Sequence, residues 1–297
     1  MKFLFDNIDF NSNSGPNSFG RKLALSLIKR GHSINTEDDV DVQISFIQAT
    51  QKIAPLIQRL DGIYFNSDQD WKKLNEPIKK TYDIADGVVY QSNFNKMLSE
   101  KYFGLKEVST VIHNGTDLNA IELIEPLKNQ IIDNFENVWC CASSWRPHKR
   151  LAENIRYFRE HAAENDCLVI AGDNADFETN HDRIFFCGSL PWDQLIALYK
   201  RSKYFLHLAL MDHCPNVVID ARAAGCHIIC ASSGGTSEIS GLDSTIVQDM
   251  EWDYLPFKLY EPPALDFSLT SPGNIESNLD INYCAEQYIQ FTESLVL

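Results

Sequence analysis

The sequence predicts an α/β protein with two domains, each built on a parallel sheet. Short apolar runs alternate with amphipathic stretches of about 10–15 residues along most of the chain, as strands and crossover helices do in parallel sheets. A polar stretch at 118–136 divides this alternation into two series. The length of 297 residues is also about twice that of an ordinary domain of ~150 residues.

In the first series, strands are expected where aromatic and β-branched residues cluster, and helices where apolar residues recur at helical spacing. Leu23, Leu27 and Ile28 share one helical face, for example, and Gly31 follows them as a helix stop. The expected strands are 2–5, 42–47, 63–65, 87–90 and 109–112, and the segment 53–60 is helical or extended. The expected helices are 19–30, 72–85 and 94–103, and a polar loop fills 7–18.

The second series follows the same rules. Its expected strands are 138–143, 167–171, 184–187, 204–208 and 227–231, and its expected helices are 150–164, 192–202, 216–224 and a final 283–297. We place an N-terminal domain at 1–125, a C-terminal domain at 126–262, and a tail at 263–297 that packs back on the first domain. Parallel sheets bind ligands at the carboxyl ends of their strands, so we expect the site in a cleft between the domains.

Composition and charge narrow the class of protein. With 44% hydrophobic and 23% charged residues, the chain is typical of globular enzymes and not of disordered chains. Its 26 basic and 41 acidic residues give a net charge of 26 − 41 = −15, which disfavours nucleic acid and anionic membranes as partners.

Sequence features also bear on the compartment. No apolar run reaches the ~18 residues of a membrane helix, and the first residues are expected to form a strand rather than a signal peptide. The 8 cysteines include no C-x2-C pair, and most lie in apolar runs. We therefore expect reduced thiols in a cytoplasmic protein, with disulfides as the alternative.

A glycine loop, Gly15-Pro-Asn-Ser-Phe-Gly20, lies between the first expected strand and helix. Glycine lets backbone N–H groups approach an anion, and the helix N-terminus that follows favours negative charge. Lys22 comes one place too late for a phosphate-binding P-loop, and no dinucleotide Gly-x-Gly-x-x-Gly pattern occurs. The loop is therefore either a phosphate contact or a plain tight turn.

A basic cluster follows the first strand of the second series. Arg146, His148, Lys149 and Arg150 lie within five residues at the start of an expected helix, where cations are unfavourable unless an anion binds there. In an acidic chain this cluster has the composition of a diphosphate site, although a solvated surface turn would show the same residues. We favour the diphosphate site.

Two carboxylates, Asp212 and Asp220, stand eight positions apart around the start of an expected helix. Pro215 suits the first helical turn, so Asp212 precedes the helix and Asp220 lies within it. Either both face one ligand, with Asp220 binding vicinal hydroxyls, or they are a cap and an unrelated helix residue. A last loop at 232–239 contains Gly-Gly and then Glu238, which fits ordinary capping or another contact in the cleft.

Seven short motifs thus follow one another along the chain. They are the glycine loop, Val-Ile-His-Asn-Gly-Thr-Asp at 111–117, Trp-Arg-Pro-His-Lys at 145–149, Ala-Gly-Asp at 171–173, Gly-Ser-Leu at 188–190, the two aspartates with Ala-Ala-Gly, and Gly-Gly-Thr-Ser-Glu-Ile at 234–239. In this order they resemble the retaining GT-B glycosyltransferases of family 4, the glycosyl transferases group 1. The resemblance implies two Rossmann-like domains whose parallel sheets face each other across a cleft, with a shortened N-terminal domain.

The resemblance also implies roles for the charged residues. Lys149 matches the family's diphosphate-binding lysine, while Ser144 stands where the family has an arginine. Arg146, two places on, would supply that missing charge. Asp212 matches the acid that contacts the donor-sugar hydroxyls, and Asp220 matches the acid that binds the nucleotide ribose, although both are one methylene shorter than the family's glutamates.

Further donor contacts are expected from three groups of residues. They are Gly15 and Asn17 in the first loop, Gly188, Ser189 and Leu190 against the base, and Pro215, Asn216 and Val217 beside sugar and phosphate. Members of the family usually have a histidine after a central strand of the first domain, where this chain has Asp61. We expect Asp61 to be the polar contact at the reacting centre.

We therefore expect an enzyme that transfers a hexose-type sugar, with retention, from a UDP- or GDP-sugar to a glycan or other small acceptor. No cofactor or metal is expected, because cationic side chains neutralise the diphosphate, and the spacing of His207, His213 and Cys214 matches no zinc signature.

Other functions remain as alternatives. Transfer to a nucleic-acid base would need a basic groove, for which the lysines at 72–80 and 96–106 are candidates, although solvated helix faces explain them better. A catalytically degenerate nucleotide-sugar-binding protein is the non-enzyme alternative. An NAD-dependent dehydrogenase is disfavoured because its glycine fingerprint is missing.

Overall fold

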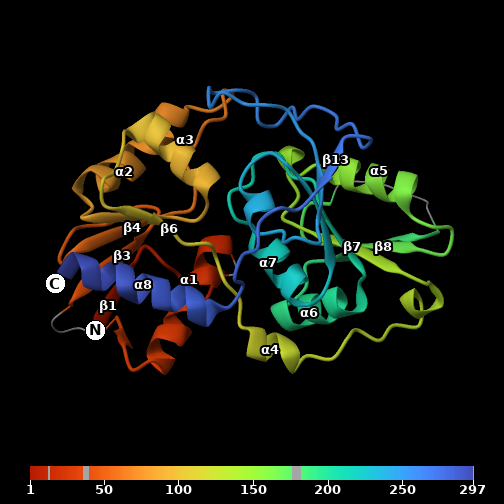
Figure 1. Ribbon diagram of the computed structural model, residues 1–297, viewed down its shortest axis with the longest axis horizontal. Helices are drawn as coiled ribbons and strands as arrows, with labels where there is room; N and C mark the ends of the chain where they lie inside the picture. Colours follow the sequence, from red (N-terminus) through yellow and green to blue (C-terminus); the bar gives the residue numbers. More distant parts are fainter. Residues whose placement is uncertain (13, 36–39, 176–181, 297) are drawn as a thin grey trace.

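The computed structural model describes residues 1–12, 14–35, 40–175 and 182–296. Two α/β halves lie side by side, each built around its own sheet (Figure 1). The first half holds a six-stranded sheet and the second a seven-stranded sheet. Both are the parallel, Rossmann-like sheets that the sequence predicts, so the expected fold class is confirmed.

The first sheet has the parallel strand order β2-β1-β3-β4-β5-β6. Its strands are β1 (Lys2–Asp6), β2 (Ser33–Ile34), β3 (Val42–Phe46), β4 (Leu56–Leu60), β5 (Gly87–Tyr90) and β6 (Ser109–Val111). Helices α1 (Gly15–Lys29) and α8 (Ile281–Val296) pack on one face, and α2 (Trp71–Ile84) and α3 (Asn93–Phe103) on the other. Because strand side chains alternate between faces, Phe3 and Phe5 pack with α1, whereas Leu56 and Leu60 pack with α2 and α3.

The second sheet has the strand order β13-β12-β11-β10-β7-β8-β9, in which β13 pairs with β12 antiparallel. Its strands are β7 (Val138–Ala142), β8 (Cys167–Ala171), β9 (Ile184–Gly188), β10 (Tyr204–His207), β11 (His227–Ala231), β12 (Thr245–Val247) and β13 (Thr270–Pro272). Helix α5 (Leu151–His161) covers one face, and α6 (Trp192–Arg201) and α7 (Asn216–Ala223) cover the other. The remaining helices are α4 (Leu118–Glu122) and the 3-10 turns η1 (Ile132–Asn134), η2 (Pro147–Lys149) and η3 (Thr236–Glu238).

The chain connects the two halves at several places. The segment after β12 passes over the top of the view in Figure 1 to α2 and α3, where Tyr254 accepts a hydrogen bond from the Tyr102 hydroxyl at 3.0 Å. The chain then returns to the second sheet as β13 before α8 packs against α1. The region 263–297 is therefore divided: α8 packs on the first half, whereas β13 belongs to the second sheet.

Several expected boundaries differ from the structure. Helix α1 begins at Gly15 rather than at residue 19, because Ser14 takes the N-cap position and Pro16 fits the first turn. Residues 63–65 form no strand, and Asn66 makes an isolated bridge to Phe257 instead. The pattern missed β2, β12 and β13, which have two or three residues each and are too short to show a period.

The cysteines and the helices bear on the expected compartment. All 8 cysteines are free thiols, and Cys187 is the exposed one. Among the residues that the structure describes, no helix combines the length and the apolar character needed to cross a bilayer.

Candidate functional site

The candidate site lies where the strand order of each sheet reverses. In the second sheet, β8 and β9 follow β7 on one side, and the chain then returns to place β10 on the other. The loops after β7 and β10 therefore diverge at their carboxyl ends and leave a crevice, which is where open α/β sheets bind ligands. Lys149 follows β7 and Asp212 follows β10, so two candidates from distant parts of the sequence meet there.

Lys149 and Asp212 are in direct contact. Lys149 Nζ donates to Asp212 Oδ2 at 2.5 Å, and His207 Nε2 donates to the same oxygen at 2.9 Å. Burial opposes ionisation of Asp212, but the charge of Lys149 and the bond from His207 outweigh it and hold the pKa of Asp212 well below its usual value. Asp212 therefore stays ionised and fixes the direction of the Lys149 ammonium, which keeps two further N–H donors.

The other members of the basic cluster have different roles. Arg146 is exposed beside Lys149. His148 is not cationic at neutral pH, because burial, together with the nearby charge of Lys149, lowers its pKa to about 3. Arg150 is buried and forms an ion pair with Asp249 at 2.6 Å. The expected group of four cations therefore reduces to Arg146 and Lys149.

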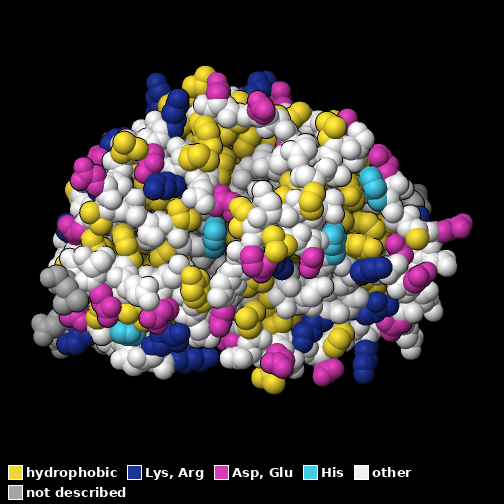
Figure 2. Space-filling view, viewed as in Figure 1, with side chains coloured by type: hydrophobic (Ala, Val, Ile, Leu, Met, Phe, Trp, Pro, Cys, Tyr) yellow, Lys and Arg dark blue, Asp and Glu magenta, His cyan; other side chains and the backbone are white. Residues whose placement is uncertain are grey.

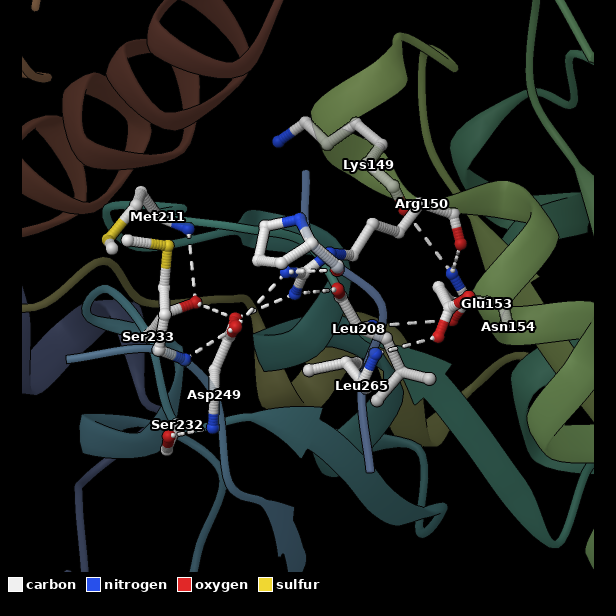
Figure 3. A network of polar contacts seen from close by, with 12 residues as sticks. Lys149, Arg150, Glu153, Asn154, Leu208, Met211, Ser232, Ser233, Asp249 and Leu265 are labelled. Atoms are coloured by element: carbon white, nitrogen blue, oxygen red, sulfur yellow. Dashed lines mark hydrogen bonds and ion pairs between the residues drawn. The ribbon is translucent and has the colours of Figure 1, made fainter. Parts of the chain in front are cut away.

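Figure 3 shows how Lys149 and Arg150, although adjacent in the sequence, leave the chain in different directions. Arg150 adopts a left-handed backbone conformation, with φ 52°, which turns its side chain into the second half. There its two terminal nitrogens bond both oxygens of Asp249, which also accepts from the Ser233 hydroxyl at 2.6 Å. This network supports the loops on which Lys149 and Asp212 lie.

Two helix N-termini, one from each half, are in contact. Asn216, the first residue of α7, donates from Nδ2 to the carbonyl oxygen of Gly15, the first residue of α1, at 2.9 Å. Pro215 precedes α7, and Val217 lies in its first turn. The expected residues of the first loop and of α7 therefore lie close together. Helix N-termini favour anions. Asn17, in contrast, uses Oδ1 to accept from the backbone N–H of Asp9 at 3.0 Å.

Asp220 is engaged by side chains from both halves. Its Oδ1 accepts from Lys22 Nζ at 2.9 Å, and its Oδ2 accepts from Trp192 Nε1 at 3.0 Å. Lys22 lies on α1 of the first half and also donates to the Thr116 hydroxyl at 3.1 Å. The carboxylate expected to bind a ribose is therefore already paired inside the protein.

The loop after β9 approaches Asp220 through Trp192. Gly188 has φ 69°, and Ser189 is exposed, with Oγ 3.4 Å from Asp173 Oδ2. Leu190 packs against the core of the second half, just before Trp192 starts α6. Ser144, after β7, has an exposed side chain.

Asp61 follows β4 and forms an ion pair with the buried Arg59. Arg59 also donates to Asn114 Oδ1 at 2.6 Å, and Asn114 in turn donates to the carbonyl oxygen of Cys214 at 3.1 Å in the second half. Asp61 Oδ2 is buried without a hydrogen-bond partner among the described residues. A sugar contact from this oxygen stays a prediction.

Glu238 joins the halves from the opposite direction. Its carboxylate accepts from the backbone N–H groups of Asn93 and Phe94 at 2.8 and 2.9 Å, at the start of α3, and from His113 Nε2 at 3.1 Å. Burial alone would raise the pKa of Glu238. The hydrogen bonds and the nearby His113 lower it by more than burial raises it, so the pKa lies below its ordinary value of 4.5.

This shift gives a pH prediction. A carboxylate with a lowered pKa stabilises the fold fully above its unfolded value and loses that contribution as the pH falls through the folded value. We expect the difference in unfolding free energy between wild type and Glu238→Gln to shrink as the pH falls below about 4.5. Urea denaturation above and below this pH would measure it, and a difference that grows on acidification would contradict the assignment.

Five residues with central contacts were not among the expected catalytic or donor-binding residues: Lys22, Arg59, Asn114, His207 and Glu238. Lys22, Asn114 and Glu238 did lie in loops or motifs that were singled out, but their partners in the opposite half are 100 or more positions away. His207 and Arg59 lie in or beside apolar strands, where a lone polar residue gives no sign of its partner.

The contacts of the described residues bear on a metal site and on a basic groove. Among the described residues, no group of three His, Cys, Asp or Glu side chains is arranged to hold a metal ion. Of the lysines at 72–80 and 96–106, Lys79 and Lys80 pair with Asp83 and Glu76, and Lys106 donates to backbone carbonyls. Figure 2 shows basic and acidic side chains interspersed on the visible face.

Comparison with known protein families finds one match, in the second half of the chain. Residues 126–253 match the family described as glycosyl transferases group 1. No curated protein matches the sequence significantly. The matched residues lie in the second half and include Lys149, Asp212 and Asp220.

Solved structures extend the likeness to the whole chain. Anabaena HepE in complex with UDP-glucose has a TM-score of 0.61 at 15% identity, covering 100% of this chain and 92% of that one. Sucrose-phosphate synthase from Thermosynechococcus elongatus has a TM-score of 0.70 at 12% identity, covering 99% of both chains. WaaG, a glycosyltransferase involved in lipopolysaccharide biosynthesis, has a TM-score of 0.60 at 10% identity, covering 100% and 94%. The chain therefore has the GT-B fold.

Proposed function

We propose that this protein is a retaining glycosyltransferase that moves a hexose-type sugar from a nucleoside diphosphate sugar to an acceptor hydroxyl. The observation that carries the proposal is the Lys149–Asp212 pair at the carboxyl ends of β7 and β10, in the half whose helix α7 also contacts the N-terminus of α1. Such groups bind a diphosphate. The family match over 126–253 and the UDP-glucose bound to HepE support the same reaction class.

The donor would lie mainly along the second half. Lys149 and Arg146 bind the diphosphate together with the first-turn amides of α7, next to Pro215, Asn216 and Val217. Gly188, Ser189 and Leu190 lie against the base, Asp220 binds the ribose, and Asp212 faces the donor sugar. Gly15 and Asn17 close the phosphate side from the first half, and Asp61 contacts the reacting centre.

The chemistry would proceed on one face of the donor sugar. The bond from the anomeric carbon to the diphosphate oxygen breaks, and the acceptor oxygen bonds to that carbon from the same side. The acceptor proton passes to the departing diphosphate oxygen, so no protein base is consumed. The protein contributes placement and charge: Asp212 orients Lys149, and Lys149 with Arg146 stabilises the negative charge that develops on the leaving group.

No metal or other cofactor is needed in this proposal, because the cations and helix N-termini carry the charge of the diphosphate. A closed cleft would exclude water, which would otherwise hydrolyse the donor. The acceptor would approach from the first half, between Asp61 and the donor sugar. We propose a glycan or other small hydroxyl acceptor.

A panel of UDP-, GDP- and ADP-sugars tests the proposal. We expect one of them to raise the unfolding temperature, since a ligand at 100 times its Kd stabilises the fold by about 2.7 kcal/mol. Mass spectrometry should then show slow hydrolysis of that donor, and NMR of the freshly released sugar should show the anomeric configuration of the donor. Binding without any release of sugar would contradict an enzymatic role, and inverted product would contradict retention.

A binding protein without turnover is the second candidate function. The observation in its favour is that both aspartates are already occupied by protein cations, Asp212 by Lys149 and Asp220 by Lys22. A protein of this kind would bind a nucleotide sugar in the panel above, but the donor would remain intact over long incubation and with any acceptor.

A further inference from the structure

Lys22 makes an unusual contact for a residue of the first half. Its ammonium reaches across the cleft from α1 into the second half, 2.9 Å from Asp220 Oδ1, and lies 5.3 Å from the centre of the Trp192 ring. The Thr116 hydroxyl, 3.1 Å away, completes its surroundings. An anion, a hydroxyl and an aromatic face therefore hold one ammonium group that comes from this chain itself.

The contact leaves no room at Asp220 for a ligand. The Asp220 side chain is 5% exposed and that of Lys22 14% exposed. One carboxylate oxygen bonds Lys22 and the other bonds Trp192. Trp192 belongs to the same half as Asp220 and is fixed by the core of that half, whereas Lys22 has a long flexible stem on the opposite half. Lys22 is therefore the group that can leave.

We propose that Lys22 competes with the nucleotide for Asp220, so that donor binding must displace it and the protein without a donor holds its own ribose site closed. This inference rests on the proposed function, in which Asp220 binds the ribose. A ribose offers two hydroxyl donors to a carboxylate and can replace the bonds that Lys22 gives up.

The second contact between α1 and α7 gives the competition a wider effect. Asn216 bonds Gly15 at the N-terminus of the same helix that carries Lys22. Lys22 and Gly15 thus attach α1 to the second half at two points along one helix. Displacing Lys22 removes the charged one of these two attachments, so binding at Asp220 is coupled to the separation of the halves. A ligand that competes with Lys22 binds only the form of the protein in which Lys22 has left Asp220. The apparent affinity of such a ligand is its intrinsic affinity multiplied by the fraction of protein in that form.

The test compares Lys22→Met with Lys29→Met. Methionine keeps the unbranched stem and removes the charge. Lys29 is the matched control because it lies on the same helix, is exposed, and pairs with Asp117 at 3.6 Å, away from Asp220. Calorimetric titration would use UDP, GDP and ADP, and inorganic pyrophosphate as a ligand without ribose.

We expect Lys22→Met to bind its preferred nucleoside diphosphate about 10-fold more tightly than wild type, because Oδ1 of the buried Asp220 then lacks a donor until the ribose supplies one. Pyrophosphate affinity should be the same in all three proteins, and Lys29→Met should match wild type throughout. Equal or weaker nucleotide binding by Lys22→Met would overturn the competition, while leaving the proposed function intact.

Two further outcomes separate the proposals. If none of the three nucleotides binds wild type or Lys22→Met, the proposed function itself fails, and the competition fails with it. Without ligand, amide hydrogen exchange in α7 and in residues 113–117 should be faster in Lys22→Met than in Lys29→Met, because one attachment between the halves is gone. Equal exchange rates would overturn the coupling to separation of the halves.

Discussion

Replacing Lys149 with methionine is expected to reduce donor turnover by about 10²-fold or more, as the loss of one preorganised donor does at other charged transition states. Lys149 is the cation that Asp212 holds at 2.5 Å, at the carboxyl ends of β7 and β10. The substitution removes the charge that would stabilise the departing diphosphate. The effect should be larger on kcat than on KM, because the additional negative charge on the leaving diphosphate oxygen develops only as the bond breaks.

The control for this experiment is Lys128→Met, which removes an equal charge from an exposed position of the second half. Its turnover should equal that of wild type. Asp212 keeps its bond from His207 in Lys149→Met, so the fold should remain, as thermal unfolding can verify. Turnover close to wild type in Lys149→Met would show that this lysine does not bind the diphosphate.

Replacing Arg150 with methionine is expected to lower the free energy of unfolding by about 3–5 kcal/mol, because it leaves Asp249 as a buried charge without its partner. Both side chains are 1% exposed, and Arg150 also donates to the carbonyl oxygen of Pro263 at 3.0 Å (Figure 3). Urea denaturation would measure the loss. Adjacent cations of one sequence cluster would then have different effects, Lys149 on turnover and Arg150 on stability.

The double variant Arg150→Met with Asp249→Leu provides the matched control. It removes the unpaired charge together with its partner, and replacing a whole buried ion pair by apolar residues is often neutral. Most of the lost stability should return. If the single variant costs less than about 1 kcal/mol, the pair is no better than a surface ion pair and the network does not support the site.

The strand-end rule explains why part of the site could be predicted. Lys149 and Asp212 follow strands that the apolar pattern predicts, and parallel strands bring their carboxyl ends to one edge. The sequence could not show that Arg150 turns away from Lys149, because its partner Asp249 is 99 positions distant and comes after a strand of three residues. The adjacent cations therefore suggested a single binding group, whereas in the structure Lys149 pairs with Asp212 and Arg150 pairs with the buried Asp249.

The fold could be predicted where elements are long enough to show a period. Helices such as α3 and α6 have ten or more residues and a clear apolar face. The start of α1 was misplaced because Gly15 and Pro16 are typical of turns, although both also suit a helix N-terminus. Contacts such as Lys22 with Asp220 depend on how the two sheets face each other, which no local pattern contains.

The place of α8 has a consequence for how the chain folds during synthesis. Ile281, Cys284 and Tyr288 of α8 complete the core of the first half, together with α1 and β1 from the opposite end of the chain. The second half is thus inserted within the first. Synthesis proceeds from the N-terminus, so the core of the first half can be completed only after all strands of the second half, β7 to β13, have been synthesised.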